Sequence, residues 1–294
     1  MKTKLPKVEE LFEAGTHYGH QVRRWHPKMA KYIYSVQDNV HVINLEETEK
    51  LLAKAAEFLH EVATKGEQII FVGTKRQARG IIEDTAKQCG ALYVNERWLG
   101  GTMTNFKTIK KNVDKLLTHI RKKEAGEYNK YTKKERLLID REIEKLQKIV
   151  GGLVNLNGVP SAVVVIDPRK EKTAVSESNK MGVPVVSLID TNSDPTGIKY
   201  IIPGNDDALK SISLIMNTLA NAVEEGYKDF EKIKDKIKAD KAAADKKKQA
   251  EDEEIRPVIV KGVEITEESA DKEIKETVKK AKPLEKEKIE EKIN

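Results

Sequence analysis

Short apolar runs alternate with amphipathic segments along much of the chain. The runs QIIFV, LYV, AVVVI and PVVSLI, with YII as a possible edge strand, are separated by helix-like stretches. Strands that are apolar at every position are typical of a parallel sheet covered by helices on both faces. The pattern therefore predicts an α/β fold with a parallel sheet of about five strands flanked by helices.

The N-terminal part predicts smaller elements beside this sheet. In VEELFEAG, a helix places Val8, Leu11 and Phe12 on one face and ends at a glycine. The segments YIYSV and VHVIN flank an Asp-Asn pair and predict a β-hairpin. Asn44, with Glu47 three residues later, resembles a capping box at the start of the next helix.

Residues 105–150 interrupt the alternation of strands and helices. They contain no strand-like run, and their apolar residues recur at spacings of four and three. The two repeats are Ile109, Val113, Leu116 and Ile120, and then Ile139, Ile143, Leu146 and Val150. Thr132 and Glu135 form a second capping-box pattern between them. We expect an inserted antiparallel coiled-coil helical hairpin, with two ordinary packed helices as the alternative.

These patterns divide the chain into three parts. Residues 1–104 and 151–226 form the α/β body, residues 105–150 the hairpin insertion, and residues 227–294 a C-terminal extension. The extension is rich in lysine, glutamate and alanine, and its apolar residues are too sparse to bury a core. We expect it to be helical at first and otherwise largely disordered, with RPVIVKGVEI as a transient strand.

Charge is distributed unevenly between these parts. The extension carries 19 basic and 19 acidic residues, so the net charge of +6 belongs to the body and its insertion. A positive excess suits a polyanionic partner. The single cysteine excludes an intrachain disulfide and a cysteine-based zinc site. With no apolar run long enough to span a bilayer and no signal-peptide pattern, we expect a cytoplasmic protein without a membrane partner.

Two glycine-containing stretches invite comparison with phosphate-binding loops. FVGTKRQARG reads as strand, glycine turn and helix, with the predicted helix running over TKRQARGIIEDTAKQ. It matches neither of the common nucleotide-binding glycine patterns. A basic helix start that faces an RNA phosphate is the stronger interpretation, beside a plain turn. In RWLGGTMTNFKTIKK, Gly100 and Gly101 are expected to permit a sharp turn that leads into the basic insertion, while Trp98 and Leu99 anchor the loop.

Histidines and aspartates suggest a metal site at the carboxyl ends of the strands, where such sheets bind ligands. His17 and His20 lie three residues apart, and Asp190, Asp194 and Asp206 follow the last strands. Imidazole and carboxylate groups both bind zinc. The residue pattern leaves open whether they form this site or are two ordinary histidines. It offers no serine nucleophile motif and no paired carboxylates with an obvious substrate pocket.

Two basic clusters predict contacts with RNA. Residues 107–136 contain 11 basic and four acidic side chains, and QVRRWHPKMAKY interleaves basic with aromatic residues. Lysine and arginine contact phosphates, whereas tryptophan can stack on unpaired bases. The predicted RNA-binding residues are Arg23, Arg24, Trp25, Lys28, Lys75, Arg76, Arg97, Lys107, Lys110, Lys111, Lys115, Arg121 and Lys122.

Seven blocks of the sequence together resemble one protein family. They are EAGTHYGHQVRRWHPKM, FVGTKRQA, VNERWLGGTMTNFKTI, YTKKE, VVVIDPRKE, GVPVVSLIDTNSDP and IPGNDDA. In this order they resemble the bacterial small-subunit ribosomal protein S2 family from residue 8 to about residue 226. His26 and Glu96 depart from its usual asparagine and histidine, and GGLVNLNGVP also differs from the usual pattern.

The resemblance implies a flavodoxin-like body with the coiled-coil insertion and a structural, non-catalytic role in translation. The implied partners are small-subunit ribosomal RNA and neighbouring ribosomal proteins, with ribosomal protein S1 among the candidates, and no homo-oligomer is expected. The family resemblance also suggests a metal pocket at His20, Asp190 and Asp206. No cofactor is expected to be required, and a structural zinc or magnesium ion is the option to test. The alternative function is a flavodoxin-like enzyme that binds a nucleotide or flavin.

Overall fold

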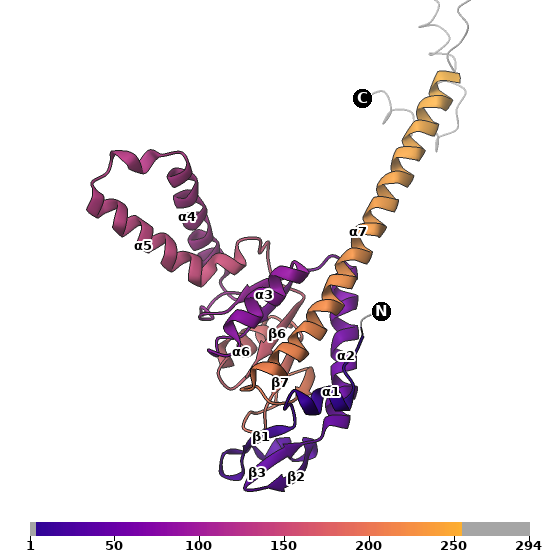
Figure 1. The fold of residues 1–294 in the computed structure, drawn as a ribbon. Coiled ribbons are helices and arrows are strands. Elements are labelled where there is room, and N and C mark those ends of the chain that lie inside the picture. Colours follow the sequence, from indigo (N-terminus) through magenta and orange to yellow (C-terminus); the bar gives the residue numbers. More distant parts are fainter. Residues whose placement is uncertain (1–3, 255–294) are drawn as a thin grey trace, which may run out of the picture. The chain divides into compact units, whose positions relative to one another are not determined.

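A five-stranded parallel sheet forms the centre of the fold (Figure 1). The computed structural model describes residues 4–254, and their side chains as far as Lys234. The sheet has the order β5-β4-β6-β7-β8. Its strands are β4 (Ile69–Val72), β5 (Leu92–Val94), β6 (Ala162–Ile166), β7 (Val185–Ile189) and β8 (Tyr200–Pro203). The predicted parallel α/β architecture is therefore confirmed, and YII is an edge strand.

Both faces of this sheet are buried, which explains why its strands are apolar throughout. Ile69 and Phe71 face one cluster, while Ile70 and Val72 face the other. The first cluster is covered by α2 (Leu45–Thr64), α3 (Arg79–Cys89) and α7 (Leu209–Glu254). The second is covered by α6 (Lys172–Lys180), the loop that contains Trp98 and Met103, and Met29. Successive residues of a strand thus pack against opposite helical layers.

A smaller antiparallel sheet is formed by the N-terminal region. It has the order β1-β3-β2 and consists of β1 (Tyr18–Gln21), β2 (Ile33–Gln37) and β3 (Val40–Ile43). The predicted hairpin corresponds to β2 and β3, with Asp38 and Asn39 both at positive φ in the turn. Strand β1 was not predicted, because YGHQ is short and has only one large apolar residue. The 3-10 helices η1 (Val22–Arg24) and η2 (Pro27–Tyr32) connect β1 to β2.

Three local predictions need correction. Helix α1 (Val8–Glu13) forms, but Phe12 is 60% exposed, whereas Leu11 is fully buried. Asn44 caps α2 by accepting from the Glu46 N–H, whereas Glu47 pairs with Lys50 instead of completing a capping box. Helix α3 begins at Arg79, so TKRQA is a turn that precedes the helix.

Residues 105–150 form two helices, α4 (Phe106–Glu124) and α5 (Lys133–Val150), joined through η3 (Glu127–Lys130) (Figure 1). Val113, Leu116 and Val150 are buried between them, while Ile109 joins the second cluster of the body. Thr132 and Glu135 form the predicted capping box. The 3-10 helix η4 (Gly151–Leu153) then leads back to β6.

Helix α7 continues past residue 226, the predicted end of the body. The compact unit extends as far as Lys238. Tyr227 donates a hydrogen bond to the Glu67 carbonyl, and the Phe230 ring lies against Gly66. The predicted strand RPVIVKGVEI lies outside the described residues. Within the described part of the chain, no helix combines the length and apolarity needed to cross a membrane.

Candidate functional site

A buried cluster of ionisable side chains lies at the carboxyl edge of the parallel sheet. Asp190 follows β7, Asp206 precedes α7, and His20 comes from β1 of the small sheet. Each offers one potential ligand atom, and these atoms lie within 4.8 Å of one another. Asp190 and Asp206 are fully or almost fully buried, whereas His20 is half-buried. The structure thus brings the three predicted metal ligands together.

Thr191 connects β1 to the end of β7 and so positions His20. The His20 backbone N–H donates to Thr191 Oγ1 at 2.9 Å. Gly19 permits this approach, because a Cβ there would lie 2.7 Å from Thr191 Cγ2. Thr191 in turn donates to Asp190 Oδ1 through its hydroxyl. The sequence GHQ is therefore held against IDT, and His20 Nδ1 lies 2.8 Å from Asp190 Oδ2.

Lys75 is the internal counter-ion of this cluster. Its Nζ lies 2.7 Å from Asp206 Oδ1, 3.0 Å from Asp207 Oδ1 and 3.2 Å from Asp167 Oδ2. Burial disfavours the ammonium, but the surrounding carboxylates outweigh it and raise the Lys75 pKa. Lys75, predicted to contact RNA, is instead turned inward, with its side chain 13% exposed.

Burial and neighbouring charge set the protonation of the other members. Burial, followed by the charge of Asp190, raises the pKa of Asp206 to about 7. The contact with Asp190 raises the pKa of His20. Asp206 Oδ2 is buried without a hydrogen-bond partner. A second cation would satisfy this oxygen, so the donor set fits a small metal ion. One imidazole with two carboxylates suits zinc better than magnesium, which prefers oxygen ligands.

Two residues considered for the metal site lie elsewhere. His17 is buried and stacks on Phe12, with ring centroids 4.3 Å apart. Asp194 accepts from Lys28 Nζ at 3.2 Å and from the Thr196 hydroxyl. Hydrogen bonds from Thr196 lower the pKa of Asp194 to about 2, so this carboxylate is ionised and already paired.

The predicted RNA-contact residues other than Lys75 are exposed. Arg23, Arg24, Trp25 and Lys28 lie on or beside η1 and η2, while Arg76 and Arg97 follow β4 and β5. His26 caps η2 by accepting from the Lys28 N–H, a role that asparagine also performs. The departure at His26 thus preserves local structure. Glu96, the other departure, pairs with Arg79 at 2.8 Å.

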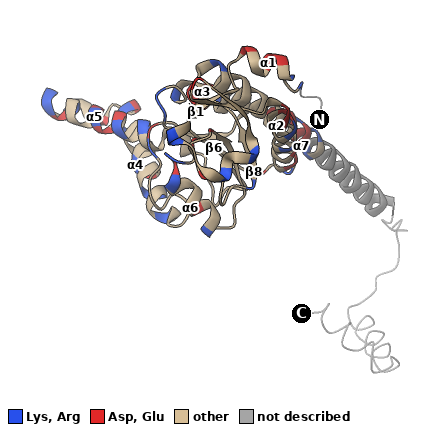
Figure 2. Ribbon diagram, turned by 90° about the horizontal axis from the view of Figure 1, so that it is seen from below, with Lys and Arg blue, Asp and Glu red and all other residues tan. Residues whose placement is uncertain are grey.

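Helices α4 and α5 carry many basic and acidic residues along their length (Figure 2). The predicted RNA-contact residues on α4 are Lys107, Lys110, Lys111, Lys115, Arg121 and Lys122. Lys115 pairs with Glu142 of α5, and Lys123 pairs with Asp140 at 2.7 Å. Among the described residues, Lys107, Lys110 and Lys111 have no ion-pair partner and remain available for an anionic ligand.

Glu177 organises the loop that precedes α4, and the sequence pattern did not reveal it. Its carboxylate accepts from the backbone N–H groups of Gly101, Met103 and Thr104, at 2.7, 3.0 and 3.3 Å. It also accepts from Trp98 Nε1. The predicted anchoring role of Trp98 agrees with its burial, and Gly101 adopts a φ of 90° in the turn. Gly100 has no positive φ and only open space beside it.

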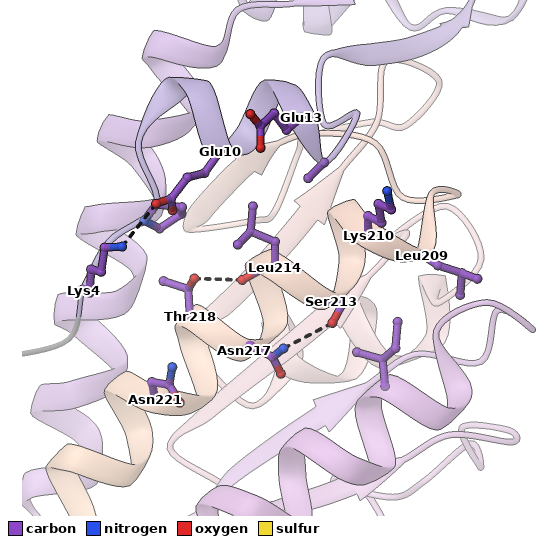
Figure 3. A pocket seen from close by; sticks show the side chains of 13 residues that line it. Lys4, Glu10, Glu13, Leu209, Lys210, Ser213, Leu214, Asn217, Thr218 and Asn221 are labelled. Carbon is purple, nitrogen blue, oxygen red and sulfur yellow. Dashed lines mark hydrogen bonds and ion pairs between the residues drawn. The ribbon is translucent and has the colours of Figure 1, made fainter.

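A separate groove lies between the N-terminal segment, α3 and α7 (Figure 3). It has a volume of about 890 Å³, and its labelled side chains include Ser213, Asn217, Thr218 and Asn221. Thr218 donates to the Leu214 carbonyl, and Asn217 donates to the Ser213 hydroxyl. No histidine or cysteine lines this groove among the described residues, and its serine pairs with an amide rather than with a base.

Comparison with known proteins places the chain in a family. The family model described as "Ribosomal protein S2" matches residues 11–226. A relative from Picosynechococcus sp., named "Small ribosomal subunit protein uS2", is 48% identical over 219 residues, which cover 74% of this chain and 86% of the relative. A relative of the same name from Sorangium cellulosum is 46% identical over 219 residues, covering 74% and 79%. The chain belongs to the ribosomal protein S2 family.

Proposed function

We propose that this chain is a structural constituent of the small ribosomal subunit that binds ribosomal RNA and neighbouring ribosomal proteins in the cytoplasm. The match over residues 11–226 carries this conclusion. The exposed basic residues around η1 and along α4 support it, because phosphate contacts supply much of the affinity for nucleic acid. The protein is not an enzyme, and its parallel sheet is a scaffold.

The body is flavodoxin-like in this proposal, and α4 with α5 is its coiled-coil insertion. Numbered along the chain, the parallel strands have the order 2-1-3-4-5, which is the flavodoxin-like order. The apolar residues buried between α4 and α5 follow the spacing of a coiled-coil seam. The basic outer surface of α4 would then be presented to RNA.

Co-sedimentation tests the ribosomal role. Small subunits that lack their S2 protein are mixed with the purified chain and centrifuged through sucrose at moderate salt. We expect stoichiometric recovery with the subunits, and competition by an authentic S2 protein. Recovery no greater than that of an unrelated protein of similar charge would contradict the proposal.

The second part of the proposal is a structural zinc ion held by His20, Asp190 and Asp206. Their proximity and the partnerless Asp206 oxygen support it. When bound, the ion would stabilise the junction between β1, β7 and the start of α7. The matched variants are Asp190→Asn with Asp206→Asn and, outside the cluster, Asp194→Asn. After dialysis, we expect near-stoichiometric zinc in the wild type and Asp194→Asn, but little in the double variant.

Thermal unfolding with and without a chelator provides a second measurement for the zinc proposal. A chelator should lower the Tm of the wild type and of Asp194→Asn, but not that of the double variant. Circular dichroism checks that the double variant is folded. Equal, negligible zinc in all folded proteins would eliminate the metal.

An exposed aromatic stack provides a surface for a neighbouring ribosomal protein. Phe12 and Tyr18 are 60% and 57% exposed, and both rings contact His17. Aromatic side chains are enriched in protein interfaces. Ribosomal protein S1 is the candidate partner to test here. Phe12→Ser should reduce retention of that partner on subunits without releasing this chain, and unchanged retention would remove this surface from the interface.

A further inference from the structure

A second groove, distinct from the metal cluster, lies between α6, η1 and the loops that follow β6 and β7. Its volume is about 890 Å³. Lys172, Ser176, Asn179 and Lys180 reach it from one face of α6. Arg24, Trp25 and His26 line the groove on its opposite side. Groove and insertion are separate surfaces, because neither α4 nor α5 contributes a lining residue.

Four basic side chains line this groove and have no ion-pair partner among the described residues. They are Arg24, Arg169, Lys172 and Lys180, all exposed. Within the part of the chain that the structure describes, Asp194 is the only acid that lines the groove, and it already accepts from Lys28 and Thr196. An anionic ligand that binds these four basic side chains would therefore not have to compete with a free carboxylate in the groove.

The groove also offers an aromatic surface. Trp25 is 37% exposed, and His41 supports its ring at a centroid distance of 5.2 Å. Pro168 and Val175 add apolar lining near the basic residues. Unpaired bases stack on aromatic side chains while arginine and lysine contact their phosphates. A helix of duplex RNA keeps its bases stacked internally, so it cannot use such a ring in the same way.

We propose that this groove binds an unpaired RNA segment, with a base stacked on Trp25 and phosphates at Arg169, Lys172 and Lys180. The inference rests on the ribosomal role and adds a second contact surface to it. Among the described residues no glycine lines the groove, so phosphates would meet side chains rather than the glycine-rich backbone N–H cradle of a nucleotide enzyme. This favours a nucleic-acid strand over a free nucleotide.

Binding to the free protein is the first test. The probe is a fluorescently labelled single-stranded RNA of about 8 nucleotides, within the site size of common single-strand binders. The variants are Trp25→Leu and the triple Arg169→Gln, Lys172→Gln, Lys180→Gln. The charge-matched control is Lys54→Gln, Lys65→Gln, Lys210→Gln, at exposed lysines outside this groove and outside the predicted RNA-contact residues. Circular dichroism checks folding, and a duplex of the same length and AMP serve as competitors.

Trp25→Leu should weaken single-strand binding by at least about fivefold, the lower end of the measured stacking effects. The triple groove variant should flatten the log–log dependence of the binding constant on salt concentration by roughly 2 units. Each of the three lost phosphate contacts contributes about 0.7 units for a single strand. The control triple should change the slope by less than about 0.7 units, the contribution of one phosphate. Trp98 is buried, so single-strand quenching of tryptophan fluorescence should disappear in Trp25→Leu. Equal binding by single strand and duplex, or unchanged binding in both groove variants, would overturn the proposal, as would stronger competition from AMP than from the strand.

Cross-linking inside assembled subunits separates this inference from the ribosomal role itself. A photoreactive benzophenone is placed at Ser176 in the groove and, as a control, at Asn217 in the groove of Figure 3; both positions are exposed. Recovery of the labelled chain in subunits tests the ribosomal role. Given recovery, a cross-link from position 176 to ribosomal RNA supports the proposal. A cross-link only to protein, or none beyond the level at position 217, overturns it while leaving the ribosomal role intact.

Discussion

At the residue scale, Glu177 is the side chain whose loss should matter most to the loop before α4. Its two oxygens accept from three backbone N–H groups and from Trp98 Nε1. Glu177→Gln replaces one carboxylate oxygen by an NH₂ group, which is a donor and would face the N–H donors of the loop. We expect a loss of about 1–3 kcal/mol in unfolding free energy at pH 7, because buried N–H groups lose their acceptor. Urea denaturation measures it, and Glu144→Gln on α5, where no hydrogen bond is known, is the control.

The same contact predicts a pH dependence. Burial opposes ionisation of Glu177, but the N–H donors outweigh it and lower its pKa. A carboxyl with a folded-state pKa below its unfolded value stabilises the fold above the unfolded pKa, and this contribution disappears as pH falls through the folded pKa. The stability difference between wild type and Glu177→Gln should therefore shrink below about pH 4.5, the ordinary glutamate value. A constant difference from pH 7 to pH 3 would contradict this role.

The two glycines of the same loop should respond differently to alanine. Gly101 has a φ of 90°, and a Cβ there would lie 3.2 Å from Asn105 Cβ. Gly101→Ala should therefore cost about 1–2 kcal/mol, a typical penalty for left-handed backbone in a residue with a side chain. Gly100 has open space, so Gly100→Ala should stay within about 1 kcal/mol of wild type. Equal effects in thermal unfolding would refute this assignment.

The sequence predicted which residues share a site only where the order of the strands already determines which residues lie close together. Asp190 and Asp206 follow neighbouring parallel strands, so a common edge brings them together. The residue pattern offered both His17 and His20 as further ligands, and the family resemblance selected His20. Glu177 was missed because a glutamate on a helix usually faces water, and its partners lie about 75 residues away. Phe12 was placed inward by helical spacing alone, but the six-residue α1 buries only Leu11.

At the element scale, the parallel strands were predictable because burial on both faces requires apolar residues at every position. Strand β1 lacks that signal, since Tyr18 and Gln21 are exposed and its function is to place His20 beside Asp190. The start of α3 was also misplaced. TKRQA has good helix formers, but Lys75 and Thr74 turn toward Asp206 and Glu171, and these tertiary contacts override local propensity.

Helix α4 allows a direct test of RNA contact by its unpaired lysines. Lys110 and Lys111 are exposed and have no ion-pair partner among the described residues, whereas Lys115 is paired with Glu142. If both unpaired lysines contact phosphate, Lys110→Gln with Lys111→Gln should flatten the log–log salt dependence of ribosomal RNA binding by roughly 1.4–1.8 units. Glutamine has a similar helix propensity, so α4 should remain folded.

Lys115→Gln is the matched control on the same helix. Its partner Glu142 already offsets its charge, so its slope should change by less than about 0.7 units, the contribution of one phosphate. Filter binding over a salt series measures the slopes, and circular dichroism checks helicity. An unchanged slope in a folded double variant would assign this surface of α4 to solvent or to a protein neighbour.

At the scale of the whole molecule, the packed body extends further along α7 than composition indicates. The region after Gly226 is rich in charge, yet Tyr227 hydrogen-bonds to Glu67 and Phe230 covers Gly66. Burial raises the Tyr227 pKa to about 12. The sequence signal for this extension of the body was the pair of aromatic residues, Tyr227 and Phe230. The rest of the charged segment offers little apolar surface to bury.

Two truncations should therefore behave differently. A chain that ends at Lys238 keeps both aromatic contacts and should match the full chain in Tm. A chain that ends at Gly226 loses the Tyr227 hydrogen bond and the partly buried Phe230 ring. It should lose about 1–3 kcal/mol in unfolding free energy, from one hydrogen bond and partial burial of an aromatic side chain. Thermal and urea denaturation measure both differences.

Incorporation into small subunits completes the comparison of the truncations. The family match ends at residue 226, and the sequence beyond Tyr227 carries balanced charge, so neither points to a required RNA contact in the extension. We expect the chain ending at Lys238 to enter subunits as fully as the full chain. The chain ending at Gly226 should be incorporated as fully as the full chain at low temperature. Its incorporation should decrease only at temperatures at which this shorter chain begins to unfold. Loss of the folded 1–238 chain from purified subunits would instead show that residues beyond Lys238 contribute a contact of their own.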